Sequence, residues 1–487
     1  MTLDLTGKCS QGSYPFFSHS VSLETTAKDP NWKVLVVDEP SMKVVSAAVG
    51  MYDIMERKVT LVESLEKKRA PFPDMGVIYL LTPTADSVSK CLADFSGKKV
   101  PYGDSVFLFF LGRLHDRFLE QIKTCKPLLK RVKCLVEVNI DFLAVQERAF
   151  HLDMRSFFPE LYTKRSSSPA EAAMAEKLVT VCATLNEYPH IRYRKSSAMA
   201  KSLASVFHLK MDQFVSQNPK WWYHGGPSKS QSAVSQRERG VLMLMDRATD
   251  CLTPLMHDFT YQAMVRDLLP LKGNCITYQN ESNEDPTQTQ AKDVLLDERD
   301  KLWVELRSQH IAQVIETLSN RIREIMNSST GSSLSKKSSS GNMSLSQMAA
   351  ALKALPEYKE VMSKLSQHMH ISHECMDIFR NQRLLDLSEL EQTLATGKDD
   401  EGRTPKLADM LDRVEDELMR IKSKEGRLRL ILITTISQGG LSSSDRKRLT
   451  HAAELKRQDM RTLNALEILG LSVFGSKGKS GGGLFGG

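Results

Sequence analysis

The chain has 487 residues, of which 41% are hydrophobic and 26% charged. This composition is that of a globular protein, and the length predicts about three domains. Its net charge of +7 is compatible with acidic helical partners or anionic membranes, but it is too small an excess to predict nucleic-acid binding. The eight Cys are scattered without CxxC spacing, and the sequence does not start with a signal peptide. It also contains no apolar run of the ~20 residues that span a bilayer. These observations predict a cytoplasmic protein with reduced thiols.

Strands and helices alternate between residues 32 and 140. Five short apolar runs predict strands at 33–37, 59–62, 77–81, 106–110 and 132–138. Helical patterns at 42–49, 84–95 and 114–124 separate most of them. This alternation favours a parallel sheet flanked by helices.

The next segment, 141–240, is mostly helical, with helices expected at 170–185 and 197–215, and together with the strand that follows it suggests a second α/β unit. That strand is expected at 241–245, a continuous apolar run that predicts a strand covered on both faces. The charged pair Asp246 and Arg247 ends this strand. Pro254 is expected to begin a helix, because its fixed φ suits a first turn. The apolar side of that helix would consist of Leu255, Phe259, Met264 and Leu268.

Helices dominate the remainder of the chain. A long helix is expected at 296–325, and a Ser-, Gly- and Lys-rich stretch at 328–346 is too polar to offset its ordering entropy. Pro356 lacks a backbone donor and predicts a kink between helices at 345–355 and 357–369. The last four helices are expected at 371–394, 407–422, 428–437 and 445–469.

The segment 240–269 resembles a signature of the SM family, the Sec-one/Munc-eighteen group of syntaxin-binding proteins. The family pattern is DR-D-PL-HE-TYQAM-DLL, and only Asp258 departs from it, where Glu is usual. The matching residues are Asp246, Arg247, Asp250, Pro254, Leu255, His257, Tyr261, Gln262, Ala263, Met264, Asp267, Leu268 and Leu269. Runs at 34–47, 77–84, 135–143, 181–189 and 295–314 also resemble the family, and its exocytic type in particular.

The resemblance implies an α/β plus α fold in the form of a three-domain arch. The N-terminal parallel α/β domain would span 1–140, and a second, discontinuous α/β domain 141–256. A large, mainly helical third domain would span 257–472, followed by a Gly-rich disordered tail at 473–487. In the family a segment returns after the helical domain to complete the second sheet. The resemblance ends near residue 469, so we expect an incomplete second domain, from a splice product or an imperfect gene model.

The resemblance also implies two binding sites on the first domain. Its inner face would contact the closed helical bundle of syntaxin through Asp38, Lys43, Glu63, Lys67, Lys68 and Arg69. Gly50 stands where the family usually has a basic residue, and an ordinary solvated surface is the alternative interpretation. A pocket for the N-terminal peptide of syntaxin would be lined by Phe118, Leu135 and Glu137. The spacing of Leu114, Phe118 and Ile122 equally favours packing of a helix on the sheet.

A third implied site is a helical hairpin around Pro356, which would serve as a template for a vesicle-SNARE helix. Its apolar anchors would be Val361, Leu365 and Met369, which have the spacing that helix-in-groove recognition requires. Burial of the same side chains between helices is the alternative.

No catalytic, cofactor or metal site is expected. The turn after Val37 contains no glycine, so a phosphate cannot approach its backbone. His368, His370 and His373 do not form an HExxH motif, because Asp377 stands where the second His belongs, and an exposed polar helix face is expected instead.

The predicted function is regulation of vesicle docking and membrane fusion by binding of SNARE proteins. The expected partners are a syntaxin, the assembled SNARE bundle and a vesicle SNARE, with a monomeric chain that reaches plasma or vesicle membranes through these partners. A helical scaffold without SNARE specificity is the alternative, and it leaves the first 140 residues unexplained.

Overall fold

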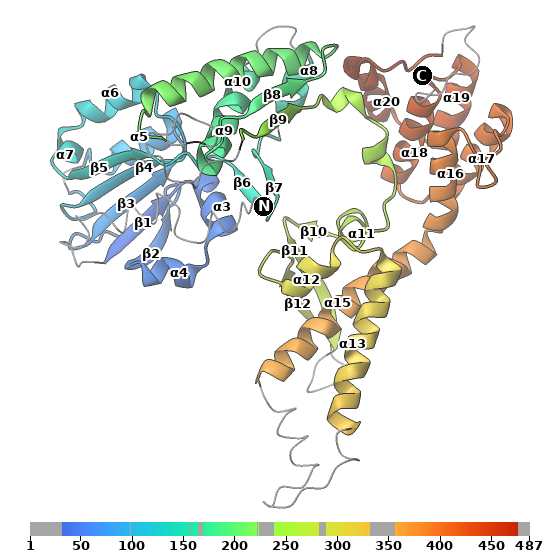
Figure 1. Ribbon diagram of the computed structural model, residues 1–487, viewed down its shortest axis with the longest axis horizontal. Coiled ribbons are helices and arrows are strands. Elements are labelled where there is room, and N and C mark those ends of the chain that lie inside the picture. The colour runs from blue at the N-terminus through green and yellow to red at the C-terminus, as the bar shows by residue number, and fades with distance from the viewer. Residues whose placement is uncertain are drawn as a thin grey trace, which may run out of the picture. The chain divides into compact units, whose positions relative to one another are not determined.

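The computed structural model describes residues 32–475, apart from residues 98, 156, 164–168, 222, 224–237, 282–288 and 332–355. The chain forms two compact units, Met1–Asp246 and Arg247–Gly487, whose elements are labelled in Figure 1. Among the described helices, none is long and apolar enough to cross a membrane. The Cys residues in the described ranges are all free thiols, as the sequence predicts.

The first unit begins with alternating strands and helices, and ends with longer helices and short strands. Its elements are β1 (Lys33–Val37), α3 (Glu39–Ala48), α4 (Met51–Glu56), β2 (Val59–Ser64), β3 (Gly76–Leu81), α5 (Ala85–Ala93), β4 (Val106–Phe110), α6 (Asp116–Thr124), α7 (Lys126–Leu129), β5 (Val132–Glu137), β6 (Leu143–Gln146), β7 (Ala149–His151), α8 (Phe157–Thr163), α9 (Pro169–Leu185), β8 (His190–Tyr193), α10 (Ala198–Gln217) and β9 (Val241–Leu244).

A parallel five-stranded sheet with the order β2-β1-β3-β4-β5 forms the centre of this unit. All five predicted strands are present. Every residue of β1, β3 and β4 is buried, because helices cover both faces of the sheet. One face packs against α3, α4 and α9 in a core that includes Phe107 and Val181. The other face packs against α5, α6 and α7, with Tyr79 and Phe118 in its core.

The strand β9 differs from the prediction that both of its faces are covered. It pairs only with β8 among the described strands, in a two-stranded parallel sheet. Leu242 and Leu244 pack toward the core between α9 and α10, whereas Val241 is 59% and Met243 64% exposed. A continuous apolar run therefore fixed the type of element here, but it did not reveal that one face is open.

The second unit is mainly helical. Its elements are two 3₁₀ turns, η1 (Arg247–Thr249) and η2 (Thr253–Leu255), then α11 (Tyr261–Leu268), β10 (Leu271–Lys272), β11 (Cys275–Glu281), β12 (Thr289–Leu295), α12 (Lys301–Leu306), α13 (Ile311–Gly331), α15 (Pro356–Asn381), α16 (Leu384–Thr396), α17 (Leu407–Arg420), α18 (Lys424–Ser437), α19 (Ser443–Ala452), α20 (Arg457–Asn464) and the 3₁₀ turn η3 (Ala465–Leu469).

Two predicted helices in the first half of this unit are wrong in their extent. The helix expected from Pro254 begins only at Tyr261. The helix expected at 296–325 is divided into α12 and α13, because the residues between them pair with the signature segment. Tyr261 N donates to Gln309 O at 2.9 Å, and Ile311 N donates to Phe259 O at 2.9 Å. A small antiparallel sheet, β10-β11-β12, was not predicted.

The helix α15 is continuous, so the break predicted near residue 370 is wrong. The break lies instead at Arg383, whose φ of 51° is in the left-handed region. Residues 345–355, and with them the junction expected before Pro356, lie outside the described residues, as does most of the polar stretch 328–346. The four residues 328–331 continue α13, and the tail is described only to residue 475.

The helices α16 to α20 share a second core in this unit. The helix predicted at 445–469 is divided into α19, α20 and η3. Glu454, with a φ of 53°, ends α19, because a left-handed residue cannot continue a helix. Leu441 forms an isolated bridge with Phe474, which holds the last described residues against this core.

Candidate functional site

Asp38 was predicted to contact a partner, but it is buried and forms hydrogen bonds within the first unit. It follows β1 and caps α3, where its Oδ1 accepts a hydrogen bond from Ser41 N at 2.9 Å. Its Oδ2 accepts from Thr82 N and from Ser87 Oγ, each at 2.7 Å. Its exposed fraction is 2%. The carboxylate thus fills the point between β1 and β3 where doubly wound sheets bind phosphates, and it excludes such a ligand by charge and volume.

Arg69 is another predicted contact residue that the fold has enclosed. Its guanidinium donates to both carboxylate oxygens of Asp94, at 2.5 and 2.7 Å, and to the backbone oxygens of Ser64 and Leu65. Asp94 also accepts from the hydroxyl of Tyr79, whose pKa is raised by burial. Arg69 therefore fixes the turn that follows β2.

The other four predicted contact residues keep a surface position. Lys43 on α3 is exposed and forms ion pairs with Glu39 and Asp153 at 3.1 and 3.3 Å. Glu63 is half-buried on β2, while Lys67 and Lys68 are exposed on the turn that Arg69 holds. We call this set of four residues, Lys43, Glu63, Lys67 and Lys68, the charged rim.

An apolar surface lies next to the charged rim and was not predicted. The helix α4 packs against β2 through Ile54, which is 3% exposed. Its other apolar side chains face solvent, with Met51 at 56%, Tyr52 at 74% and Met55 at 47% exposed. The alternation of buried and exposed apolar residues within MYDIM is the signal in the sequence, but a helix of six residues is too short for its faces to be assigned from a pattern alone.

The residues predicted to line a peptide pocket are brought together at one edge of the sheet. Phe118 on α6 is 2% exposed and shares a core with Leu135 on β5, which is half-buried. The guanidinium of Arg117 covers the Phe118 ring, 4.5 Å from its centroid. Glu137 is exposed at the end of β5, and its Oε1 accepts from Leu114 N at 2.9 Å. Phe118 thus packs in the core of the first unit, and Glu137 is a charged residue at the surface.

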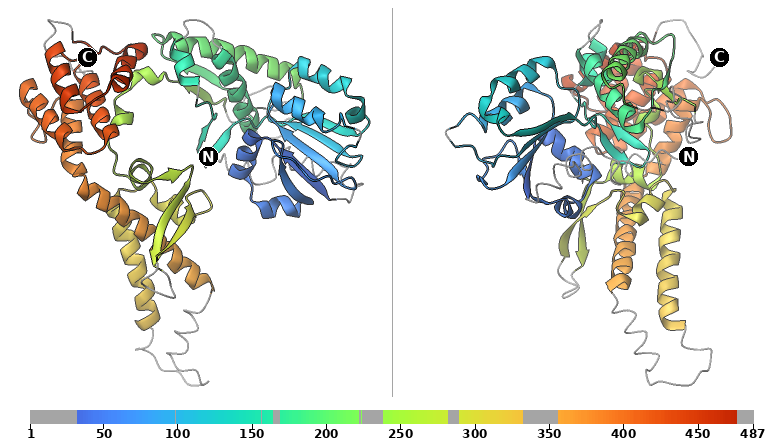
Figure 2. Two further views of the ribbon diagram at one scale, coloured as in Figure 1. Left: turned by 180° about the vertical axis from the view of Figure 1, so that it is seen from behind. Right: turned by 60° about the vertical axis from the view of Figure 1, so that its left-hand side comes forward.

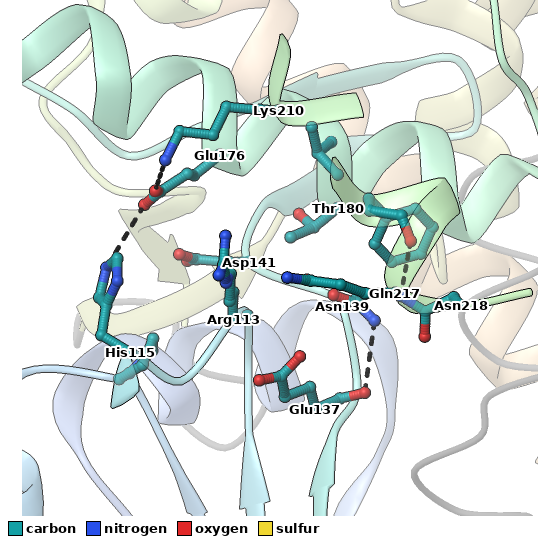
Figure 3. Close-up of a pocket in the computed structure, with 14 residues that line it drawn as sticks. Arg113, His115, Glu137, Asn139, Asp141, Glu176, Thr180, Lys210, Gln217 and Asn218 are labelled. Carbon is teal, nitrogen blue, oxygen red and sulfur yellow. Dashed lines mark hydrogen bonds and ion pairs between the residues drawn. The ribbon is translucent and has the colours of Figure 1, made fainter. Parts of the chain in front are cut away.

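A small pocket of about 110 Å³ lies beside Glu137, where β4 and β5 end and α9 and α10 cover the sheet edge (Figure 3). Its charged side chains neutralise one another. Lys210 on α10 forms an ion pair with Glu176 on α9 at 2.6 Å, and His115 Nε2 lies 4.0 Å from the same carboxylate. Arg113 donates to Gln213 Oε1 at 3.3 Å. The pocket offers donors and acceptors at the carboxyl edge of a parallel sheet, the usual ligand-binding edge of such folds.

The predicted template hairpin is formed in part by α15, which lies beside α13 (Figure 2). Val361 is 51% exposed, whereas Leu365 is 3% exposed and Met369 packs against the same core as Leu365. Pro356 is the first residue of α15. In this conformation only Val361, of the three apolar anchors, is free to meet a partner helix.

His368 is fully buried, so the prediction of an exposed polar face is wrong for this residue. His370 and His373 are exposed as expected. The Nδ1 of His368 is 3.0 Å from the hydroxyl of Tyr261, its Nε2 is 3.3 Å from Asp300 Oδ2, and its ring lies parallel to that of Trp303. Among the described residues, no group of three potential metal ligands is found.

Asp300 is the charged centre of this buried network. It caps α12 by accepting from Trp303 N at 3.1 Å, and it accepts from Lys364 Nζ at 2.8 Å. Burial alone would raise the pKa of Asp300, but the hydrogen bonds from His368, Lys364 and Trp303 outweigh it and hold the pKa well below its ordinary value. The network therefore joins α11, α12 and α15 through an ionised carboxylate.

Two further signature residues connect the halves of the second unit. Glu391 on α16 is 1% exposed and accepts from His257 N at 3.0 Å, with His257 Nδ1 at 2.9 Å. Asp267 on α11 forms an ion pair with Arg429 on α18 at 2.7 Å, and Arg429 also donates to Leu255 O. A hollow of about 890 Å³ lies between these segments. His257 and Asp267 of the signature thus connect parts of the second unit, and both are engaged in internal contacts.

Comparison with known proteins agrees with the resemblance seen in the motifs. A sequence model of the Sec1 family matches residues 33–482. The protein transport protein sec1 of Dictyostelium discoideum is 34% identical over 452 residues, which cover 92% of this chain and 72% of the relative. The SNARE-interacting protein KEULE of Arabidopsis thaliana is 31% identical over 466 residues, which cover 95% of this chain and 68% of the relative.

Among solved structures, the Unc18–syntaxin 1 complex from Monosiga brevicollis has a similar fold. The TM-score is 0.81 at 26% identity, and the alignment covers 99% of this chain and 82% of that chain. Sequence and fold agree over nearly the whole length of the chain, in both units. The chain therefore belongs to the Sec1 family.

Proposed function

We propose that this chain binds a syntaxin-type SNARE and thereby regulates vesicle docking and membrane fusion in exocytosis. The observation that carries the proposal is family membership over residues 33–482, with one relative named as SNARE-interacting and one structural neighbour solved with syntaxin. The chain acts in this proposal by binding alone, as a monomer in the cytoplasm, and carries out no catalytic step.

The charged rim and the exposed side of α4 together form the surface that binds the helical bundle of syntaxin. Interfaces commonly combine an apolar centre with a polar rim. Met51, Tyr52 and Met55 supply the apolar centre, and Lys67 and Lys68 supply positive charge beside it. Positive side chains at the edge of an interface steer an acidic partner and raise the association rate more than the affinity.

Two further contacts belong to the proposal. The edge formed by Phe118, Leu135 and Glu137 would take the N-terminal peptide of syntaxin, with Glu137 attracting a basic group of that peptide. The α15 helix would take a vesicle-SNARE helix, first through the exposed Val361. Full use of Leu365 and Met369 as anchors would require α15 to separate from the core that now covers them.

The first unit would contain two domains that meet near residue 140. Support comes from a core that α9 and α10 share with β8 and β9, although α9 also packs on one face of the sheet through Val181. The region 257–472 would be the helical domain, since it contains α11 to α20.

A pull-down with the purified cytoplasmic region of syntaxin tests the proposal. The wild-type chain should retain syntaxin, and a chain with Lys67→Glu and Lys68→Glu should retain clearly less. A matched control changes two exposed lysines outside all proposed surfaces, Lys398→Glu and Lys406→Glu, and should bind as wild type. Equal retention of syntaxin and of an unrelated coiled coil by the wild-type chain would contradict SNARE specificity.

A further inference from the structure

The helical bundle α16–α20 is electrically polarised along the sequence. Residues 384–419, which contain α16 and α17, include eleven Asp and Glu and four Lys and Arg, a net charge of −7. Residues 420–461, which contain α18, α19 and most of α20, include eleven Lys and Arg and four Asp and Glu, a net charge of +7. The net charge of the whole chain is also +7. The charges of these two segments cancel, so the net charge of the chain arises outside them, and the bundle itself is divided into an acidic half and a basic half.

One helix of each half lies on a different side of the bundle. In Figure 1 and in the opposite view of Figure 2, α17 and α20 lie on opposite sides of this bundle, with α18 between them. The helix α20 therefore lies away from the acidic α17, whereas α19, which also belongs to the basic half, packs against α17 and pairs with it through Arg448 and Asp412 at 2.9 Å. A large anionic surface attracts the basic α20 and repels the acidic α17.

Two of the four acidic residues of the basic half form ion pairs within the protein. Asp459 pairs with Lys424 at 2.9 Å and caps α20 by accepting from Lys456 N at 2.8 Å. Glu454 pairs with Arg427 at 2.7 Å. Among the described residues, five further bases of this half are exposed, namely Lys422, Lys447, Lys456, Arg457 and Arg461. We call these five residues the basic face.

Two exposed apolar side chains belong to the same segments as the basic face. Ile468, in the turn that continues α20, is 48% exposed. Phe474 is 53% exposed and is held by its bridge to Leu441, just before α19. The guanidinium of Arg446 on α19 lies 4.4 Å from the centroid of the Phe474 ring. Basic groups that surround exposed apolar side chains are typical of surfaces that enter the headgroup region of a membrane.

We propose that the basic face binds an anionic phospholipid bilayer, with Ile468 and Phe474 entering the headgroup layer. The bases come from the loop before α18, from α19 and from α20, and none of them lines either pocket described above. A spread of this kind fits a two-dimensional array of phosphates better than a single acidic helix in a groove. Four to eight bases of this kind suffice for recognition of anionic lipid. The contact requires no SNARE and goes beyond the proposed function.

Flotation of the full chain with protein-free vesicles tests this contact. The chain should bind vesicles in which a third of the phosphatidylcholine is replaced by phosphatidylserine, and should not bind phosphatidylcholine alone. Each base near an anionic leaflet contributes about fivefold to partitioning, so Lys456→Glu, Arg457→Glu and Arg461→Glu together should lower it by about 100-fold or more. Raising the salt from about 0.1 M to about 1 M shortens the Debye length from about 10 Å to about 3 Å and should abolish binding.

A matched variant with the same charge change distinguishes a specific face from the net charge of the chain. Lys398, Lys406 and Arg413 are exposed bases of the acidic half. Reversal of these three to Glu should leave vesicle binding unchanged, and an equal loss in both variants would overturn the proposal. Lys456→Glu and Arg457→Glu place Glu at the start of α20, where it suits the helix dipole, whereas Arg461→Glu lies in the last turn of α20. Circular dichroism verifies that the basic-face variant folds.

Two further experiments distinguish binding to a bilayer from binding to other anionic ligands. Soluble glycerophosphoserine at the same total headgroup concentration should not displace the vesicles, because a single headgroup lacks the multivalent array. The basic-face variant should bind the cytoplasmic region of syntaxin as wild type does. Displacement by the soluble headgroup, or loss of syntaxin together with vesicles, would show that the face serves another anionic ligand and would overturn the proposal.

Discussion

At the scale of single residues, burial decides which members of a matching motif can touch a partner. Asp38 and Lys43 both belong to the predicted contact set and are separated by one turn and a half of α3. Asp38 is buried with three hydrogen-bond donors on its carboxylate, while Lys43 reaches solvent. Asp38 therefore contributes to stability, whereas Lys43 remains accessible for the proposed contact.

Substitution of Asp38 should therefore affect folding before binding. Asp38→Ala leaves the donors of Ser41, Thr82 and Ser87 without an acceptor, and should lower the free energy of unfolding by about 2–4 kcal/mol. Lys67→Glu with Lys68→Glu should leave it unchanged and lower the association rate constant for syntaxin about tenfold. Urea denaturation and stopped-flow fluorescence measure the two quantities. A stable Asp38→Ala chain with slow association would reverse the assignment.

The buried network at Asp300 should make stability depend on acid pH. The pKa of Asp300 is lowered in the folded state, so its contribution is complete above its unfolded pKa of about 4 and is lost as the pH falls toward the folded value. Asp300→Asn should lower the free energy of unfolding by about 2 kcal/mol at neutral pH. The difference from wild type should shrink below a pH of about 4, as denaturant titrations at several pH values would measure. A difference independent of pH would contradict the role of the charge.

The buried His368 illustrates why sequence reasoning failed at this site. Local spacing placed the His residues on a polar face of α15, and it could not show that Tyr261 and Asp300, which are 107 and 68 residues earlier, surround one of them. The roles of Asp38 and Arg69 were missed for the same reason, because their partners lie on other elements.

At the scale of elements, the parallel sheet was predictable and the breaks between helices were not. The strands β1, β3 and β4 are continuous apolar runs because both of their faces are covered. Such runs can be recognised in a sequence. The break between α12 and α13 depends on backbone bonds to residues 259–262, which no local pattern reports. The sheet β10-β11-β12 was not predicted, because β11 and β12 consist largely of polar residues and lack the apolar pattern of a strand.

The helix α15 offers a test of the template proposal at this scale. Val361→Glu should leave the free energy of unfolding within about 0.5 kcal/mol of wild type, since the side chain is half exposed. It should also weaken retention of a vesicle-SNARE peptide. Leu365→Ala should instead destabilise the chain by about 2–5 kcal/mol, because Leu365 is in the core. Thermal unfolding and peptide pull-down measure both effects. Unchanged peptide binding by Val361→Glu would remove α15 from the set of SNARE surfaces.

At the scale of the whole molecule, the composition predicted a globular protein, and the motifs predicted the family to which it belongs. A parallel α/β region followed by a large helical region was predictable from periodicity alone. The function was not, because neither unit contains a motif whose chemistry implies SNARE binding. That inference came from the resemblance at 240–269, where the structure shows His257 and Asp267 to be engaged in internal contacts. The surfaces that would bind partners lie elsewhere, on α4, β2, β5 and α15.

The most direct test of the account is calorimetry of this chain with the cytoplasmic region of syntaxin, and with the same region lacking its N-terminal peptide. The account predicts binding to both, with a stronger dependence on Lys67 and Lys68 when the peptide is absent. Binding only to the form with the peptide would place the affinity at the edge formed by Phe118, Leu135 and Glu137, and would remove the charged rim from the interface. Binding to neither form would contradict the central claim that this chain is a syntaxin-binding protein.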